Sequence, residues 1–174
     1  MNRVFFRAED APLPTWTKQA GAFVKKVLKL LGHTNWEVSV LCCSNRYIKL
    51  LNAQYRGKDE PTDVLAFPLG DGDAPHAGTD AVADAGAECY VAGDIVISLD
   101  GLEENARFFN VSAEQELRRL LIHALLHLAG EDHASNDAEE PMLKHQEEIL
   151  AHFSGERIHM EEYVYDKQTQ ENST

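Results

Sequence analysis

Residues 112–130, SAEQELRRLLIHALLHLAG, constrain the fold more than any other stretch of this chain. Ser112 followed by Gln115 predicts a capping box at the start of a helix, and Gly130 predicts its end. Apolar residues at helical spacing form one side of this helix, and further leucines and an isoleucine extend the apolar surface nearly all round it. A helix of this kind is central and buried. The rest of the chain must therefore pack around it.

The remaining periodicity predicts strands and helices that do not alternate strictly. We expect strands at 2–7, 36–42, 62–69 and 89–99, and helices at 14–32, 44–57, 101–110 and 137–153. This order lacks the regular alternation of a doubly wound sheet. It predicts an α+β domain in which a small mixed sheet packs with helices around the central helix.

The length of the chain, 174 residues, suits a single domain with a substantial core, so we expect one domain over residues 1–174. Residues 70–88 are rich in Gly, Ala and Asp and contain almost no large apolar residue, which predicts a mobile loop. The residues from about 163 onward predict a frayed C-terminal tail.

Several features favour a cytoplasmic protein. No apolar run is long enough to span a bilayer, and the N-terminus MNRVFFRAED lacks the three regions of a signal peptide. Cys42 and Cys43 are adjacent within an apolar run, a setting typical of reduced thiols in a core.

The net charge of −13 argues at first against a nucleic-acid partner. Residues 1–60, however, hold ten Lys or Arg against five acidic residues, whereas residues 61–174 hold six against twenty-four. Such asymmetry permits a local basic face on an acidic protein. Charge alone still favours a soluble protein with a scattered acidic surface.

Three of the eight histidines lie in the eleven residues HALLHLAGEDH, at positions 123, 127 and 133. His123 and His127 are four positions apart, so they project from one face of the central helix, about 6 Å apart along its axis. Gly130 permits a left-handed turn that brings His133 back to them. Three neutral nitrogen ligands with an open fourth position are typical of a catalytic zinc site. Ordinary core or surface positions explain the others: His33, His76, His145, His152 and His159.

The metzincin metallopeptidases share this spacing of histidines and glycine, and a glutamate directly after their first histidine acts as the general base. Here that position is Ala124, which neither accepts nor donates a proton. The spacing therefore supports a peptidase and Ala124 opposes it.

HALLHLAGEDH also resembles the signature of the YbeY family of rRNA maturation endoribonucleases, H-G-x-L-H-L-x-G-y-D-H. LNAQYRGKDEPTDVLAFP is similar to another segment of that family, and GDIVIS and EEPMLKHQEEIL stand in the family's order. Together these matches cover about residues 45–153. Three departures are Ala124 for the usual glycine, Glu131 for an aromatic residue, and Ala66 for a serine.

The resemblance implies a zinc-dependent single-strand endoribonuclease that acts in 16S rRNA 3′-end maturation and ribosome quality control, with one Zn²⁺ per chain. It implies that His123, His127 and His133 are the zinc ligands and that Arg56 is catalytic. An arginine beside a metal can hold a phosphate by a bidentate contact. The implied partners are ribosomal RNA and ribosomal subunits, with no membrane and no DNA.

Two other classes of function stay open beside the ribonuclease, which the resemblance favours. One is a metzincin-like metallopeptidase, and the other is a non-catalytic ribosome-binding protein with a zinc site. Arg46, Lys49 and Lys58 lie near Arg56 in the sequence and could steer an RNA backbone, although a solvated helix face explains them as well.

Overall fold

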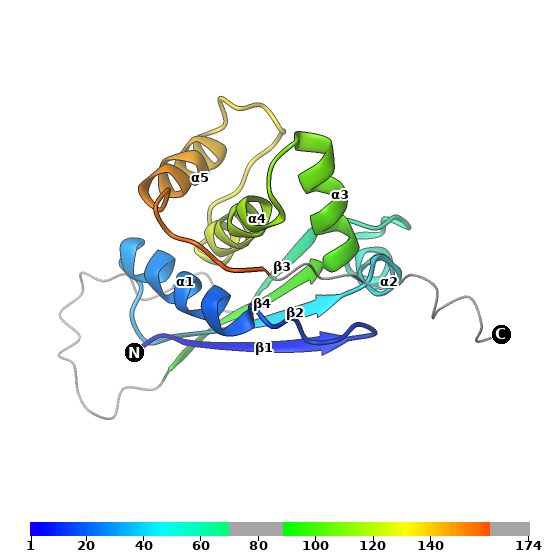
Figure 1. Ribbon diagram of the computed structural model, residues 1–174, viewed down its shortest axis with the longest axis horizontal. Helices are drawn as coiled ribbons and strands as arrows, with labels where there is room; N and C mark the ends of the chain where they lie inside the picture. Colours follow the sequence, from blue (N-terminus) through cyan, green and yellow to red (C-terminus); the bar gives the residue numbers. More distant parts are fainter. Residues whose placement is uncertain (70–88, 161–174) are drawn as a thin grey trace.

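A computed structural model describes residues 1–69 and 89–160, in which a four-stranded sheet packs with five helices (Figure 1). The elements are β1 (Arg3–Glu9), α1 (Thr17–Leu30), β2 (Trp36–Cys43), α2 (Asn45–Arg56), β3 (Val64–Pro68), β4 (Tyr90–Ser98), α3 (Leu99–Phe109), α4 (Ala113–Leu128) and α5 (Pro141–His152). The predicted α+β class is confirmed. The loop expected at 70–88 and the tail expected from about 163 lie outside the described residues.

The sheet is mixed, with the strand order β1-β2-β4-β3. Strands β1, β2 and β4 run parallel, and β3 is the antiparallel edge strand beside β4. A register shift between Glu37 and Val38 of β2 lies opposite Val91 and Gly93 of β4. Strand β4, which follows β3 in the chain, thus inserts between β2 and β3.

Side chains alternate between the two faces of the sheet and divide the core into two clusters. The larger cluster lies on the face covered by α1 and α4, and it includes Val40 of β2 and Ile95 of β4. The smaller cluster on the other face joins Ile48 of α2 to Leu65 and Val96 of the sheet. Helices α1 and α2 therefore pack on opposite faces.

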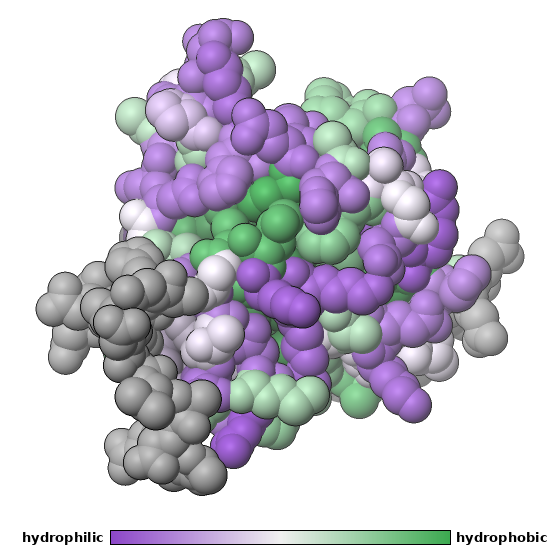
Figure 2. Space-filling view, turned by 90° about the vertical axis from the view of Figure 1, so that its left-hand side faces the viewer, coloured by the Kyte–Doolittle hydropathy of each residue, from purple (hydrophilic) through white to green (hydrophobic). Residues whose placement is uncertain are grey.

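Helix α4 is the central helix predicted by the sequence. Ten of its sixteen residues are buried, and it contacts α1, α3, α5, β3 and β4. On the side of the molecule where α1 and α5 lie, apolar side chains in the middle of the face are framed by hydrophilic residues (Figure 2). The helix that carries two of the three clustered histidines is thus held on several sides.

The predicted helix signals are confirmed at several ends. Ser44 caps α2 by accepting a hydrogen bond from the Tyr47 amide, and α2 ends on Gly57 in the left-handed conformation. Ser112 Oγ accepts from the Gln115 amide at 3.1 Å, which is the N-cap bond of the predicted capping box. Helix α5 was predicted from residue 137 but begins at Pro141, which occupies the first turn, where a missing amide hydrogen costs nothing.

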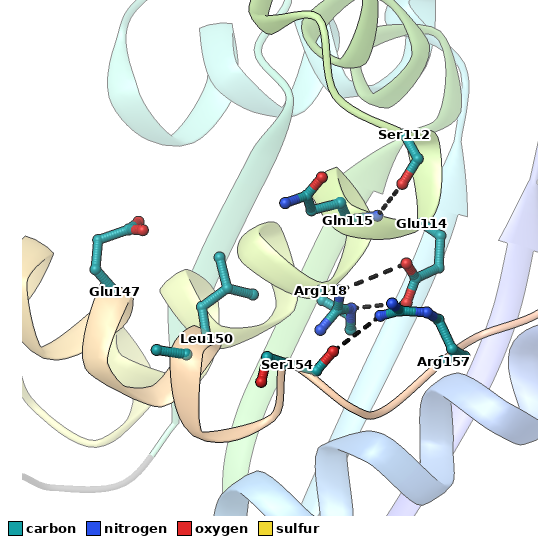
Figure 3. A pocket seen from close by; sticks show the side chains of 9 residues that line it. Ser112, Glu114, Gln115, Arg118, Glu147, Leu150, Ser154 and Arg157 are labelled. Atoms are coloured by element: carbon teal, nitrogen blue, oxygen red, sulfur yellow. Dashed lines mark hydrogen bonds and ion pairs between the residues drawn. The ribbon is translucent and has the colours of Figure 1, made fainter.

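An ion pair between Glu114 and Arg118, one turn apart in α4, carries the contacts that hold the chain after α5 (Figure 3). Arg118 is 4% exposed, and its Nε lies 2.7 Å from Glu114 Oε1. Arg118 also donates to the Phe153 carbonyl, and the Ile158 amide donates to Glu114. These contacts hold residues 153–158 against the first turns of α4.

Cys42 and Cys43 are free and buried, as predicted, and burial raises the pKa of each thiol to about 12. Within residues 1–69 and 89–160, no helix is long and apolar enough to cross a membrane.

Candidate metal centre

The three clustered histidines converge because of how α4 ends. His123 and His127 lie one turn apart on the last two turns of α4. The chain then turns at Gly130, whose φ of +88° is the left-handed conformation predicted for it. This turn returns His133, and the ligand nitrogens of the three rings lie within 4.8 Å of one another. The structure therefore brings together all three residues that the sequence singled out.

Each ring donates its Nδ1 hydrogen to an oxygen outside the cluster. His127 Nδ1 lies 3.0 Å from the Glu131 carbonyl, and His133 Nδ1 lies 2.9 Å from the Ser135 carbonyl. His123 Nδ1 lies 2.9 Å from Gln146 Oε1. Carbonyl oxygens only accept hydrogen bonds, so the tautomer with the hydrogen on Nδ1 is the one that fits each ring.

The orientation of the Gln146 amide is fixed by a second contact. Its Nε2 donates to Glu147 Oε1 at 3.0 Å, which leaves Oε1 facing His123. The Nε2 atom of each ring consequently keeps its lone pair. Between His123 and His127 these two Nε2 atoms lie only 3.1 Å apart.

Imidazole lone pairs that face each other this closely repel unless a cation lies between them. Outer oxygens that fix the Nδ1–H tautomer are the usual partners of metal-ligating histidines. Burial lowers the pKa of His123 and of His127, which keeps both rings in the neutral form that binds metal. The cluster can bind a metal ion, and its donors fit one.

A pocket of about 240 Å³ opens beside the cluster. Arg56, at the last turn of α2, lines it together with the three histidines, and its Nη2 lies 3.4 Å from the Ala66 carbonyl. The contact uses a backbone oxygen, so the replacement of serine by Ala66 leaves it intact. The structure thus brings Arg56, which is far from the histidines in the sequence, to the same pocket.

The residues around the turn have separate contacts. Glu131 places Oε1 2.7 Å from His145 Nδ1, so its carboxylate pairs with α5. Asp132 accepts the His133 amide hydrogen, and its Oδ1 lies 3.7 Å from His127 Nδ1. Ala124 is fully buried in the pocket wall and brings no carboxylate there.

Gln146 is a site residue that the sequence analysis did not identify. It is 3% exposed and lies on the buried stripe of α5 with Met142 and Ile149. The sequence did carry one signal for it: a polar amide stands where the helical spacing of α5 calls for an apolar core residue. Among the other described histidines, His33 stacks on Trp36 and His152 packs against Phe153, so neither joins the cluster. His76 lies outside the described residues.

A family model described as Endoribonuclease YbeY matches residues 6–154 of this chain. The chain belongs to the YbeY family. A Treponema denticola protein named Endoribonuclease YbeY is 46% identical over 137 residues, which cover 79% of this chain and 83% of that protein. The protein of the same name from Treponema pallidum (strain Nichols) is 41% identical over 151 residues, covering 87% and 89%.

A solved structure supports the fold at the level of the whole chain. The solution structure of a Thermotoga maritima protein is 32% identical and matches with a TM-score of 0.58, covering 90% of this chain and 91% of that one. The three histidines, Ala124 and Arg56 all lie within the part that the family model matches.

Proposed function

We propose that this chain is a zinc-dependent endoribonuclease that cleaves single-stranded RNA. One observation supports this proposal above the others. Three imidazoles, each hydrogen-bonded through Nδ1 to an oxygen, bring their ligand nitrogens within 4.8 Å of one another, beside a pocket that an arginine also lines. Its membership of a family named for endoribonuclease activity agrees with that chemistry.

The metal proposed for the site is zinc, one ion per chain, held by His123, His127 and His133. Three neutral nitrogen ligands with room for a fourth suit catalytic zinc, whereas structural sites close all four positions. A zinc ion held there supplies Lewis-acid activation of water and of a phosphodiester.

Arg56 is the proposed catalytic side chain for the phosphate. Its guanidinium is planar and always charged, so it can bind two phosphate oxygens at once. In the pocket beside the histidines it stabilises negative charge that grows on the phosphodiester during cleavage. With its Nη2 near the Ala66 carbonyl, the guanidinium is oriented before RNA binds.

The biological role that we propose is 16S rRNA 3′-end maturation and ribosome quality control in the cytoplasm, with ribosomal RNA and ribosomal subunits as partners. Residues 1–174 form one catalytic domain in this proposal. Ala124 opposes the metzincin-like alternative, because the pocket offers no carboxylate at the position where those peptidases carry their general base.

The decisive experiment compares wild-type protein with His127→Ala for zinc content and for cleavage of ribosomal RNA. We expect one zinc per chain in the wild type, and loss of both zinc and cleavage in the variant. Cleavage by a zinc-free variant would contradict the proposal. Zinc with binding to ribosomal subunits but no cleavage would indicate the non-catalytic alternative, and cleavage of casein would indicate the peptidase.

Arg56→Ala separates catalysis from metal binding. We expect full zinc content and a fall in kcat of about a hundred-fold, because an electrostatic contact to the transition state is lost. Arg56→Lys keeps the charge without the bidentate geometry and should recover only part of the rate. Loss of zinc from Arg56→Ala would assign Arg56 a structural role instead.

A further inference from the structure

A second, larger groove continues from the histidine cluster. It has a volume of about 880 Å³ and runs among α3, α4 and α5. Five residues line both this groove and the smaller pocket that contains Arg56: His123, His133, Thr62, Asp63 and Val64. The two hollows therefore adjoin at the histidines, and a nucleotide next to a phosphate bound there lies close to the groove.

One wall of the groove is an aromatic ring beside a cation. Helix α3 ends on Phe109, which is 56% exposed and lines the groove. The Cζ atom of Arg119 lies 5.8 Å from the centroid of the Phe109 ring. The Phe109 ring also contacts that of Phe108 edge to face, with the centroids 5.0 Å apart, and it is open to the groove.

The Arg119 guanidinium is held in a fixed plane. Its Nε and Nη2 donate to the two carboxylate oxygens of Glu116, which is only 1% exposed. Asn105 donates to Glu116 and to Asp63, which completes the network behind the wall. Arg119 is thus a prearranged flat cation and not a mobile surface side chain.

The rest of the groove combines apolar and amide groups with one exposed carboxylate, that of Glu147, which accepts a hydrogen bond from Gln146. Its apolar lining comes from Val111, Leu120, Leu143 and Leu150. The side-chain amides of Gln115 and Asn136 also line it, and neither makes a hydrogen bond to another described residue. Proteins bind unstacked RNA bases with aromatic rings, arginine planes and amides of this kind. A bare phosphate site would instead gather cations and amide hydrogens.

We propose that this groove binds the unpaired base of a nucleotide next to the scissile phosphate, and that this base stacks on the wall formed by Phe109 and Arg119. The inference rests on the proposed ribonuclease function and names the residue that selects single strands. In a duplex both faces of each base are already stacked, so a paired base cannot use the wall. Phe109 then contributes substrate binding, while Arg56 and the histidines contribute the chemistry.

The test measures kcat and KM of the zinc-loaded protein on a short single-stranded RNA with one cleavage site. Stacking on an aromatic side chain is worth enough for about a ten-fold change in affinity per base. We expect Phe109→Ala to raise KM about ten-fold, and Phe109→Tyr to keep KM within two-fold of wild type. Phe5→Ala is the control, because Phe5 of β1 is 50% exposed and lines neither the groove nor the smaller pocket. Thermal melting should be unchanged in all three variants.

Two further RNAs, each with one abasic nucleotide, one on the 5′ side and one on the 3′ side of the cleavage site, identify the contact. On one of these RNAs the KM of the wild type should rise about as much as Phe109→Ala raises KM on intact RNA. On that same RNA the wild type and Phe109→Ala should have equal KM values. The stacking proposal is wrong, while the ribonuclease stands, if Phe109→Ala has the same KM as Phe5→Ala on intact RNA. It is also wrong if Phe109→Ala has a KM about ten-fold above that of the wild type on both abasic RNAs. No cleavage by zinc-loaded wild type would overturn both.

Discussion

At the scale of single residues, the tautomers of three histidines decide what the cluster can do. Each ring donates Nδ1–H to an oxygen, and those oxygens come from Gln146, Glu131 and Ser135. Two are backbone carbonyls in the loop after α4, which the left-handed turn at Gly130 positions. Only Gln146 orients its histidine through a side chain, so it can be tested by substitution.

Gln146→Leu should weaken zinc binding about 10- to 100-fold, because it removes the oxygen that orients His123 and leaves a buried Nδ1–H without an acceptor. Competition with a chromophoric chelator measures the affinity. Gln146→Glu keeps an acceptor at the same place and should bind zinc nearly as wild type does. Equal affinity in the Leu variant would mean that packing alone orients the ring.

At the scale of helices and strands, capping residues in the sequence predicted several helix ends. The sequence did not predict which elements contact each other. Ser44 and Gly57 mark the ends of α2 as the sequence indicated, because a cap depends on neighbouring residues only. The predicted start of α1 at residue 14 was early, since α1 begins at Thr17. The contact between His123 and Gln146 spans 23 residues and two helices, so no local pattern encodes it.

The same limit applies to the strand order. The mixed sheet was predicted, but nothing local states that β4 lies between β2 and β3. Gly93 is one residue on which that arrangement depends. Its φ is +146°, and a Cβ atom there would lie 2.2 Å from the Phe67 carbonyl oxygen of β3 and 2.9 Å from Leu128 Cδ2 of α4.

Gly93→Ala should therefore lower the free energy of unfolding by at least about 2 kcal/mol, through backbone strain together with steric overlap. Denaturant unfolding followed by circular dichroism measures it. Gly155→Ala is the control, because nothing lies within 4 Å of a Cβ built there, and its change should stay within about 0.5 kcal/mol. A Gly93 variant as stable as this control would show that β3 shifts away from β4 without cost.

At the scale of the whole molecule, the charge distribution must be reconciled with a polyanionic substrate. The chain carries a net charge of −13, yet Lys and Arg outnumber acidic residues two to one in residues 1–60. Arg46, Lys49 and Arg56 lie on α2, with Lys58 just after it. Arg46 lies at the other end of the helix from Arg56. Because Arg56 lines the pocket beside the histidines, the end of α2 from Lys49 to Lys58 is where the acidic protein offers an RNA backbone positive charge.

The combined change Lys49→Glu and Lys58→Glu should raise the Kd for single-stranded RNA and flatten its dependence on salt. Each lost phosphate contact reduces the slope of log K against log salt by about 0.7. Lys18→Glu with Lys29→Glu changes the net charge by the same amount on α1, which packs on the opposite face of the sheet from α2. That control should keep the wild-type slope. Equal loss in both double variants would mean that RNA responds to the total charge of the protein, and the basic end of α2 would then have no special part in docking.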